Sequence, residues 1–341
     1  MRFGSVCLEA IGYCIPEEIV TSAQLEQELA EAFASLGFSP GRLEQLTGVC
    51  ERRLWPVGTR PSSLAAKAGQ EVLAKSGVDP GKIDLLIHTG VCRDALEPAT
   101  AAVVHQLLGL DPHCQAFDLS NACLGFLHGI TTAASLIELG QIEYALIVSG
   151  ENAGPIYTDT IAHLRQNPRG EEVRNNLASL TLGSAGIALL LCHTRLATTG
   201  HRLLGGMFQI DSLGANLCTG YGDIFHQRMT TDTAEMMRQG LELSQITWEL
   251  FKRELAWEQN TPDFVLNHQV SRVHQEKAFK ALGLPEEKTY SNLYRFGNTG
   301  SAAVALELAL GWEQGLFKPE DRIALLGIGS GLGCLMLGIE W

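Results

Sequence analysis

Three residues that lie far apart in the sequence, Cys123, His268 and Asn298, have side chains suited to acyl transfer. Cys123 follows a short β-rich stretch, residues 115–119, and stands where a helix is predicted to begin. The unpaired N–H groups and the macrodipole of a helix N-terminus favour negative charge. A cysteine at such a position can have its pKa lowered from ~8.5 to roughly 3.5–7.5. Cys123 is therefore a candidate nucleophile, and a buried structural cysteine is the equally open alternative.

His268 and Asn298 are the candidate partners of this cysteine. His268 ends a predicted strand in FVLNHQVSR, so its ring can project from the sheet edge into a cleft. There it would assist thiolate formation and then donate a hydrogen bond to a thioester carbonyl. Asn298, in GNTGSA, carries no useful proton and would act as a donor through its side-chain amide. A core histidine and a turn asparagine are the structural alternatives, but together the three residues suggest a Cys–His–Asn site.

Two further residues, Glu97 and Ser330, lie in segments that could take part in catalysis. Glu97 precedes Pro98 in RDALEPATA. Its carboxylate could simply stabilise the N-terminus of the following helix. It could instead act as a base if burial raises its pKa. Ser330 lies in GIGSGLG, which superficially suggests a dinucleotide loop. This glycine pattern lies too near the C-terminus to open a βαβ unit, so we reject nucleotide binding. Its glycines would instead allow a close approach of the backbone to a reacting group.

The strands and helices that must position these residues form two successive segments of similar α/β organisation. Continuous apolar strands separated by helices predict sheets that are buried on both faces. A crossover near residues 175–205 suggests two halves, residues 1–190 and 191–341, and the polar stretch 158–176 is expected to be irregular. Strands are predicted at residues 83–90, 115–119, 144–150, 186–192, 203–209, 263–268, 322–330 and 334–340, and helices at 64–75, 98–110, 123–139, 232–255 and 273–282.

Composition excludes several classes of protein. The net charge of -13 and the absence of a basic run argue against nucleic-acid binding. No segment reaches the ~18–20 apolar residues of a membrane span, and the N-terminus reads as a strand and not as a signal peptide. The nine cysteines are scattered without a CxxC pair, so we expect no disulfide framework, no metal site and a cytoplasmic location. Arg52, Arg53 and Arg272 could meet an acidic carrier or a nucleotide, although fold-supporting contacts are favoured for the first two.

The order of these segments resembles the thiolase superfamily, specifically its β-ketoacyl-ACP synthase III branch. The resemblance is carried over nearly the whole chain by TGVCERRLW (47–55), the Cys123 run, HQVSR (268–272), GNTGSA (297–302) and GIGSGLG (327–333). VCRDALEPATA (91–101) and NHQVSRVH (267–274) are most similar to OleA-type acyl-CoA condensing enzymes of olefin biosynthesis. The resemblance implies a five-layered αβαβα fold of two pseudo-symmetric halves, a cytoplasmic homodimer, acyl-CoA as substrate, and no metal or redox cofactor.

The resemblance also implies roles for the candidate residues. Cys123 would carry the acyl group, His268 and Asn298 would share one oxyanion site, and the N–H of Ser330 would join that of Cys123 in a second. Glu97 would cross a dimer interface and remove an α-proton, which a head-to-head condensation of two fatty acyl thioesters requires. The alternative is a decarboxylative synthase III that uses acyl-CoA and malonyl-ACP and needs no strong base.

Two residues beside Asn298 depart from the family pattern. Phe296 stands where many of these synthases carry histidine, and Ser301 stands where the OleA-type enzymes often carry proline. Both departures concern substrate selectivity more than the core chemistry. The sequence leaves open the acyl chain length and whether an acyl carrier protein is a partner.

Overall fold

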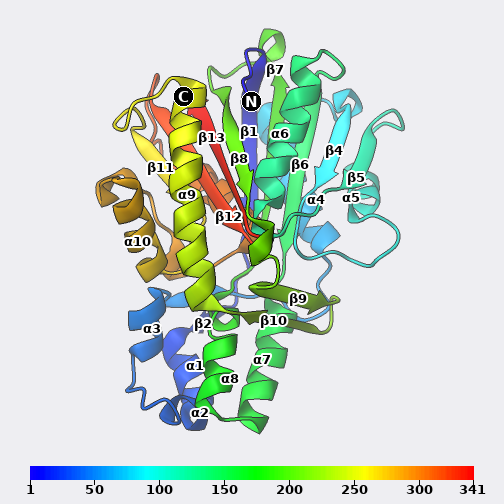
Figure 1. Ribbon diagram of the computed structural model, residues 1–341. Coiled ribbons are helices and arrows are strands. Elements are labelled where there is room, and N and C mark those ends of the chain that lie inside the picture. Colours follow the sequence, from blue (N-terminus) through cyan, green and yellow to red (C-terminus); the bar gives the residue numbers. More distant parts are fainter.

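The computed structural model describes residues 1–341 and is built around one nine-stranded sheet (Figure 1). Its strand order is β11-β12-β13-β8-β1-β7-β6-β4-β5. The strands of this sheet are β1 (Val6–Cys14), β4 (Leu85–His88), β5 (Gln115–Asp118), β6 (Tyr144–Glu151), β7 (Ala185–His193), β8 (Arg202–Ile210), β11 (Phe264–Asn267), β12 (Arg322–Gly329) and β13 (Gly333–Glu340).

The sheet consists of two halves with the same internal order. In each half the first strand, β1 or β8, lies innermost and pairs with the last strand, β7 or β13. The two innermost strands meet through a single bridge between Cys7 and Arg202. The second half lacks a counterpart of β5. This repeated order confirms the predicted pseudo-symmetry, while the boundary at residues 190 and 191 stays a prediction.

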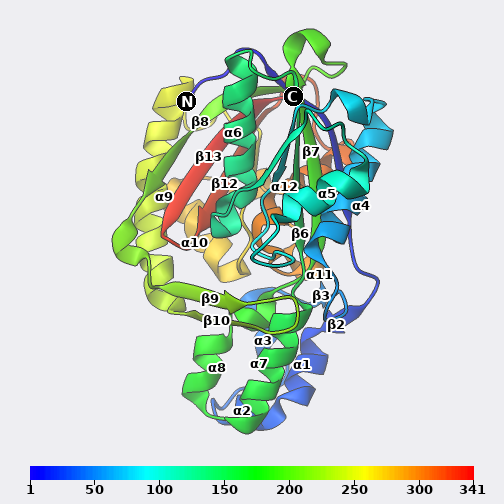
Figure 2. The same ribbon diagram turned by 90° about the vertical axis from the view of Figure 1, so that its right-hand side faces the viewer.

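Helices form three layers around the two halves (Figures 1 and 2). Helices α4 and α5 pack on the outer face of the first half, and α9 packs on β8 and β13 of the second half with α10 beside it. Helices α6 and α12 contact strands of both halves and share one core cluster of 36 buried residues with them. The five predicted layers are therefore confirmed. The helices are α4 (Pro61–Ser76), α5 (Thr100–Leu108), α6 (Gly125–Glu138), α9 (Thr233–Leu255), α10 (Arg272–Leu282) and α12 (Ala303–Glu313).

Local sequence signals explain where several helices begin and end. Pro61 occupies the first position of α4, and Gly77 ends this helix in the left-handed conformation. The side chain of Asp232 caps α9 by accepting the N–H of Glu235, and Ser271 caps α10 in the same way. The Ser271 cap starts α10 at Arg272, shortly after the end of β11 that carries His268.

A helical lobe and a hairpin lie at one end of the sheet (Figure 1). The predicted irregular stretch 158–176 is wrong, because most of it is helical. Its polar sequence hides a narrow apolar stripe, and Ile161, Leu164 and Val173 are buried in the core of the lobe. The elements at this end are β2 (Ile19–Thr21), α1 (Ser22–Glu28), α2 (Ala30–Ala34), α3 (Arg42–Thr47), β3 (Glu51–Arg53), α7 (Gly154–Gln166), α8 (Gly170–Asn176), β9 (Cys218–Gly222) and β10 (Gln227–Thr231).

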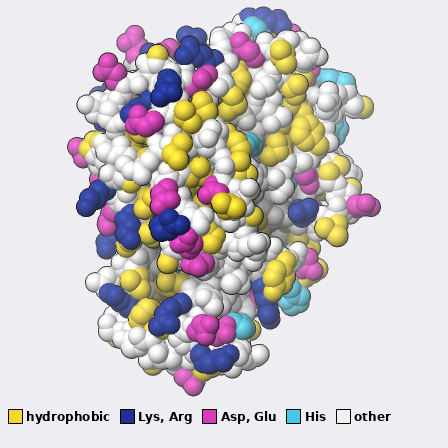
Figure 3. All heavy atoms as spheres, viewed as in Figure 1, with side chains coloured by type: hydrophobic (Ala, Val, Ile, Leu, Met, Phe, Trp, Pro, Cys, Tyr) yellow, Lys and Arg dark blue, Asp and Glu magenta, His cyan; other side chains and the backbone are white.

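The distribution of charged side chains, the helices and the cysteines can be described for the whole chain. On the face shown in Figure 3, acidic and basic side chains are interspersed without a continuous basic stripe. None of the helices combines the length and the apolar character that a membrane span requires. All nine cysteines are free thiols.

Candidate active site

Four of the five predicted site residues line one cavity of about 440 Å³. Cys123 comes from the turn before α6, His268 from the end of β11, Asn298 from the loop before α12, and Ser330 from the end of β12. Both halves of the fold therefore contribute to the same site. Glu97 is not among the residues that line the cavity of its own chain.

The turn that carries Cys123 is held by close backbone packing. The helix predicted to begin at Cys123 begins two residues later, at Gly125, after a 3₁₀ turn over Ala122–Leu124. Ala122 has a φ of 46°, a left-handed conformation that is strained for a residue other than glycine. A Cβ at Gly329 would lie 3.1 Å from Leu124 Cγ and 3.6 Å from Cys123 N, so the end of β12 packs directly on this turn.

The environment of Cys123 corrects the expected ionisation. Burial, with smaller contributions from Glu151 and Cys218, raises the pKa of the Cys123 thiol to about 12. The sequence predicted a lowered pKa, but burial of the thiol outweighs the effect of the helix N-terminus. The Cys123 thiol is therefore neutral at rest, and the predicted role as nucleophile would require it to lose its proton during the attack.

This pKa predicts how the free thiol responds to alkylation. The rate of iodoacetamide reaction at Cys123 should rise about tenfold per pH unit between pH 7 and 10, because only the thiolate reacts. Intact-mass kinetics of the Cys92→Ala/Cys218→Ala protein, which removes the other cavity thiols, would measure it. A plateau below pH 8 would show a low-pKa thiolate and contradict this account.

His268 is positioned by the parallel pairing of β11 with β12. Its backbone N–H donates to the carbonyl of Leu326 at 2.8 Å, which continues the ladder beyond the last strand residue. Burial lowers the pKa of His268 to about 3, and His274 contributes to the same shift. Its Nδ1 is buried without a protein partner. A neutral imidazole can accept a proton from a thiol or donate one N–H, as the predicted role requires.

Hydrogen bonds hold Asn298 so that only its side-chain amide nitrogen, Nδ2, has no protein partner. Its backbone N–H donates to Thr181 at 2.9 Å, and its carbonyl accepts the N–H of Gly183 at 2.9 Å. Its side-chain Oδ1 accepts the N–H of Gly300 at 3.0 Å, and Gly300 adopts a φ of 61°. The Nδ2 hydrogens are thereby left for a ligand in the cavity, which fits the predicted role as a donor.

Ser330 lies at the start of the turn between β12 and β13. Its backbone N–H donates to no protein acceptor. The next residue, Gly331, has a φ of 120°, which favours glycine. An unpaired N–H beside a turn that opens a helix is the arrangement expected of an oxyanion site.

Glu97 lies outside the cavity, on the loop between β4 and α5. Its side chain is exposed, and the adjacent Leu96 is 88% exposed. An exposed leucine and glutamate at a loop tip indicate a surface that another chain could cover. The predicted entry of Glu97 into a partner's site therefore stays a prediction.

The structure adds site residues that the sequence analysis missed. Cys92, Cys218 and His274 were not proposed as site residues, but all three line the cavity. Glu151 also lines the cavity and is only 4% exposed. A carboxylate at the end of a buried strand, in IVSGEN, was the available signal for Glu151.

The three arginines considered for binding a carrier or a nucleotide have other contacts. Arg52 is fully buried and donates to Val20 O and Ser22 Oγ, which supports the fold as favoured. Arg53 donates to Glu51. Arg272 is exposed and donates to the carbonyl of Gln45.

A buried acid supports the strand end beside His268. Glu307, on α12, is fully buried, and its Oε2 accepts the N–H of Asn267 at 3.1 Å. Its Oε1 has no protein partner. Burial raises the pKa of Glu307 well above its ordinary value, so the folded protein keeps this group protonated.

Glu307→Gln is expected to make the protein relatively more stable as the pH rises. The raised folded pKa contributes stability below the unfolded pKa of ~4.3 that is lost as the pH rises toward the folded value. Gln keeps the acceptor but does not titrate. The difference in free energy of unfolding should therefore grow by about 1.4 kcal/mol per pH unit above pH 5. Urea titrations at pH 5, 6 and 7 measure it, and a pH-independent difference would contradict the protonated state.

Known proteins share this fold and sequence. Residues 253–341 match the family model for the C-terminal part of 3-oxoacyl-[acyl-carrier-protein] synthase III, and residues 117–165 match the model for that synthase. Acyl-CoA:acyl-CoA alkyltransferases of Shewanella oneidensis and Xanthomonas campestris are 35% and 36% identical, each over 100% of both chains. A crystal structure of Xanthomonas campestris OleA superposes with a TM-score of 0.96 at 36% identity, covering 100% of this chain and 98% of the other.

The fold and the convergent residues define a condensing enzyme of the 3-oxoacyl-[acyl-carrier-protein] synthase III class, within the thiolase superfamily. Identity above 30% over the full length of both relatives narrows the class further. The chain belongs to the OleA-type family of acyl-CoA:acyl-CoA alkyltransferases.

Proposed function

We propose that the protein joins two fatty acyl-CoA molecules head to head by a non-decarboxylative Claisen condensation. The carrying observation is that Cys123, His268, Asn298 and Ser330 line a single cavity, as a covalent acyl transfer requires. The names of the full-length relatives, acyl-CoA:acyl-CoA alkyltransferases, support acyl-CoA as the substrate on both sides.

The first half-reaction loads the enzyme. The Cys123 thiol attacks the thioester carbonyl of one acyl-CoA, and its proton passes to His268, whose imidazole is neutral at rest. The N–H groups of Cys123 and Ser330 stabilise the tetrahedral oxyanion. Collapse of this intermediate breaks the C–S bond to CoA, and the departing CoA thiolate takes up a proton. The product is an acyl group on Cys123 and free CoA.

The second half-reaction forms the carbon–carbon bond. A second acyl-CoA binds with its carbonyl oxygen at the His268 and Asn298 donors, which stabilise the enolate. The Glu97 carboxylate of a second subunit removes the α-proton, and the resulting carbanion attacks the acyl-cysteine. The thiolate of Cys123 leaves, and the product is a 2-alkyl-3-oxoacyl-CoA or, after hydrolysis, the acid. The reaction uses no metal or redox cofactor.

A homodimer follows from the place of Glu97. Leu96 and Glu97 form an exposed loop tip between β4 and α5, outside the cavity of their own chain. Burial in a partner's cavity would raise the pKa of Glu97 toward a useful range. We therefore propose a cytoplasmic homodimer in which each chain supplies Glu97 to the other.

The runner-up function is a decarboxylative synthase III that extends an acyl-CoA with malonyl-ACP. It is favoured by a Natranaerobius thermophilus β-ketoacyl-[acyl-carrier-protein] synthase III that is 28% identical over 97% of this chain and 98% of its own. The two functions differ in their need for a base, because decarboxylation itself generates the carbanion.

Mixing two inactive variants tests the proposed site. Cys123→Ala and Glu97→Gln proteins should each fail to condense myristoyl-CoA. Dissociated together and reassociated, they should recover about one quarter of the parental activity, because half of the dimers then hold one complete site. No recovery, in a mixture shown to contain heterodimers by native mass spectrometry, would place Glu97 outside the partner's site.

A further inference from the structure

The loop that carries Glu97 is fixed on both sides of a short exposed tip. It runs from the end of β4 to the start of α5, and its tip, residues 95–99, is mostly exposed. Before the tip, the backbone N–H groups of Val91 and Cys92 donate to the two carboxylate oxygens of Glu151, at 2.9 and 3.2 Å. Glu151 is thus the first anchor of the loop.

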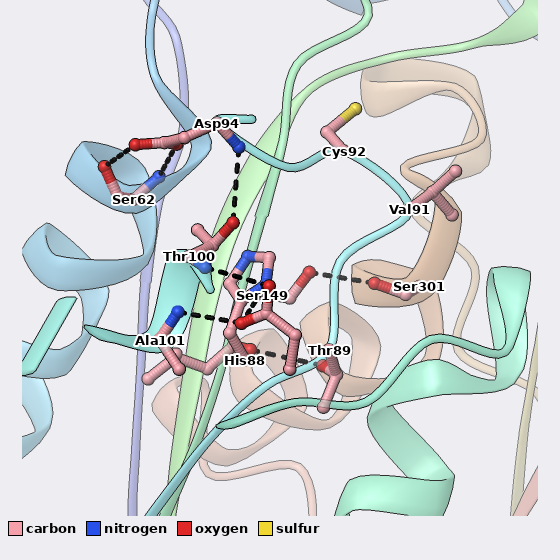
Figure 4. A network of polar contacts seen from close by, with 12 residues as sticks. Ser62, His88, Thr89, Val91, Cys92, Asp94, Thr100, Ala101, Ser149 and Ser301 are labelled. Atoms are coloured by element: carbon pink, nitrogen blue, oxygen red, sulfur yellow. Dashed lines mark hydrogen bonds and ion pairs between the residues drawn. The ribbon is translucent and has the colours of Figure 1, made fainter. Parts of the chain in front are cut away.

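A second set of contacts fixes the loop around its tip (Figure 4). The Asp94 carboxylate accepts the N–H and the hydroxyl of Ser62, at 2.9 and 2.6 Å. The N–H of Asp94 donates to Thr100 Oγ1 at 3.2 Å. Asp118 accepts the N–H groups of Thr100 and Ala101, at 2.8 Å each. Contacts of the Glu151 and Asp94 carboxylates therefore hold the loop before its tip, and contacts of the Asp118 carboxylate hold it after the tip.

Glu151 also binds the segment that carries Asn298. Its Oε1 accepts the N–H and the hydroxyl of Ser301, at 3.1 and 2.6 Å. The Ser301 hydroxyl lies 2.8 Å from the hydroxyl of Ser149 on β6 (Figure 4). A Cβ at Gly300 would lie 3.2 Å from Oε1 of Glu151, so the loop after Asn298 packs closely on this carboxylate. One buried side chain thus joins the Asn298 segment to the Glu97 loop.

The contacts of Glu151 determine what it can do. Three backbone N–H groups and one hydroxyl donate to its two oxygens, and the side chain is 4% exposed. An acceptor whose oxygens are occupied in this way is poorly placed to take a proton from a substrate. It is well placed to hold two backbone segments at a constant separation.

We propose that Glu151 is a positioning residue for the condensation half-reaction. It holds the Glu97 loop in register with the Asn298 segment and so determines where Glu97 is presented to the partner's cavity. This inference rests on the proposed function, in which Glu97 removes the α-proton. The loading of Cys123, which uses Cys123, His268 and Ser330, does not depend on this register.

Glu151→Gln removes the anchor with little change in volume. An amide has one acceptor oxygen, and its NH₂ group would face the N–H of Cys92 or the donors of Ser301. The loop that carries Glu97 should then shift by about 1 Å or less. A misplacement of about 1 Å of a catalytic group can lower the rate about 10²-fold.

The test separates the two half-reactions. Release of CoA in a single turnover with myristoyl-CoA, together with the intact mass of acyl-Cys123, measures loading. Formation of the β-keto product measures condensation. In Glu151→Gln, loading should not fall, because loss of the Glu151 charge lowers the pKa of Cys123, and condensation should fall about 10- to 100-fold. Ser149→Ala, which removes only the outer hydroxyl of the network, is the matched control and should keep both rates.

A double variant identifies the route of the effect. If Glu151 acts through the Glu97 loop, adding Glu151→Gln to Glu97→Gln should lower condensation by less than about threefold more, since coupled residues are not additive. A multiplicative loss would overturn the inference while leaving the role of Glu97 intact. Full condensation by Glu97→Gln alone would overturn that role, and this inference with it.

Two further results would contradict the positioning role. Equal losses of loading and condensation would indicate a general structural defect, and an unchanged condensation rate would show that the anchor is unnecessary. If Glu151→Gln does not fold, Ser301→Ala provides the readout, because it removes the 2.6 Å donor and keeps both loop contacts. It should lower condensation alone, by about 3- to 10-fold.

Discussion

Replacing Cys123 by alanine is expected to abolish both half-reactions. In the proposed mechanism the acyl group is carried on this sulfur. Loss of a nucleophile that works together with a base costs roughly 10⁴- to 10⁶-fold in turnover. No acyl-enzyme should appear by intact mass spectrometry, and no CoA should be released above the uncatalysed rate.

Two other thiols in the same cavity provide the matched controls for this variant. Cys92 and Cys218 line the cavity with Cys123, but neither lies on the turn that packs against the end of β12. Cys92→Ala and Cys218→Ala should each retain acyl-enzyme formation within about tenfold, as expected for neighbours that only shape the cavity. Acyl transfer that survives in Cys123→Ala and is lost in Cys218→Ala would assign the nucleophile to Cys218.

Glu97→Gln is expected to separate loading from condensation. The variant should form the acyl-enzyme at the parental rate, because the thiol and the N–H donors are untouched. Condensation from acyl-CoA alone should fall by about 10²- to 10⁴-fold, the usual contribution of a general base. Glu258→Gln, with the same charge change at an exposed position, should behave like the parent.

The same variant discriminates between the two functions. With malonyl-ACP as the second substrate, a decarboxylative enzyme would keep its rate in Glu97→Gln, since no α-proton has to be removed. Parental condensation by Glu97→Gln with acyl-CoA alone would show that another base removes the proton. Asp223, a carboxylate that also lines the cavity, would then be the first residue to replace.

The sequence predicted the parts of the site that depend on strand and helix order. Apolar strands followed by polar residues placed His268 and Ser330 at strand ends, and these ends meet in one cavity. Cys123 and Asn298, which were singled out from the Cys123 run and from GNTGSA, line the same cavity. Continuous apolar strands predicted sheets that are buried on both faces, as β6, β7 and β13 are, whereas the five layers were implied by the family resemblance.

What the sequence missed depends on tertiary contacts. The pKa of Cys123 is raised mainly because residues from several segments of the chain bury its thiol. No local sequence pattern reports such burial. Glu151 meets its donors 59 and 60 residues earlier and 150 residues later in the chain. Helices α7 and α8 were missed because their apolar stripe is narrow and their surface is polar.

The central claim is head-to-head condensation without a malonyl donor. The most direct measurement is incubation of the purified protein with myristoyl-CoA alone, and then with malonyl-ACP added, with the products identified by mass spectrometry. We expect a long-chain β-keto acid, or the ketone formed from it by decarboxylation, from myristoyl-CoA alone. Product that appears only after malonyl-ACP is added would contradict this account and establish the decarboxylative synthase.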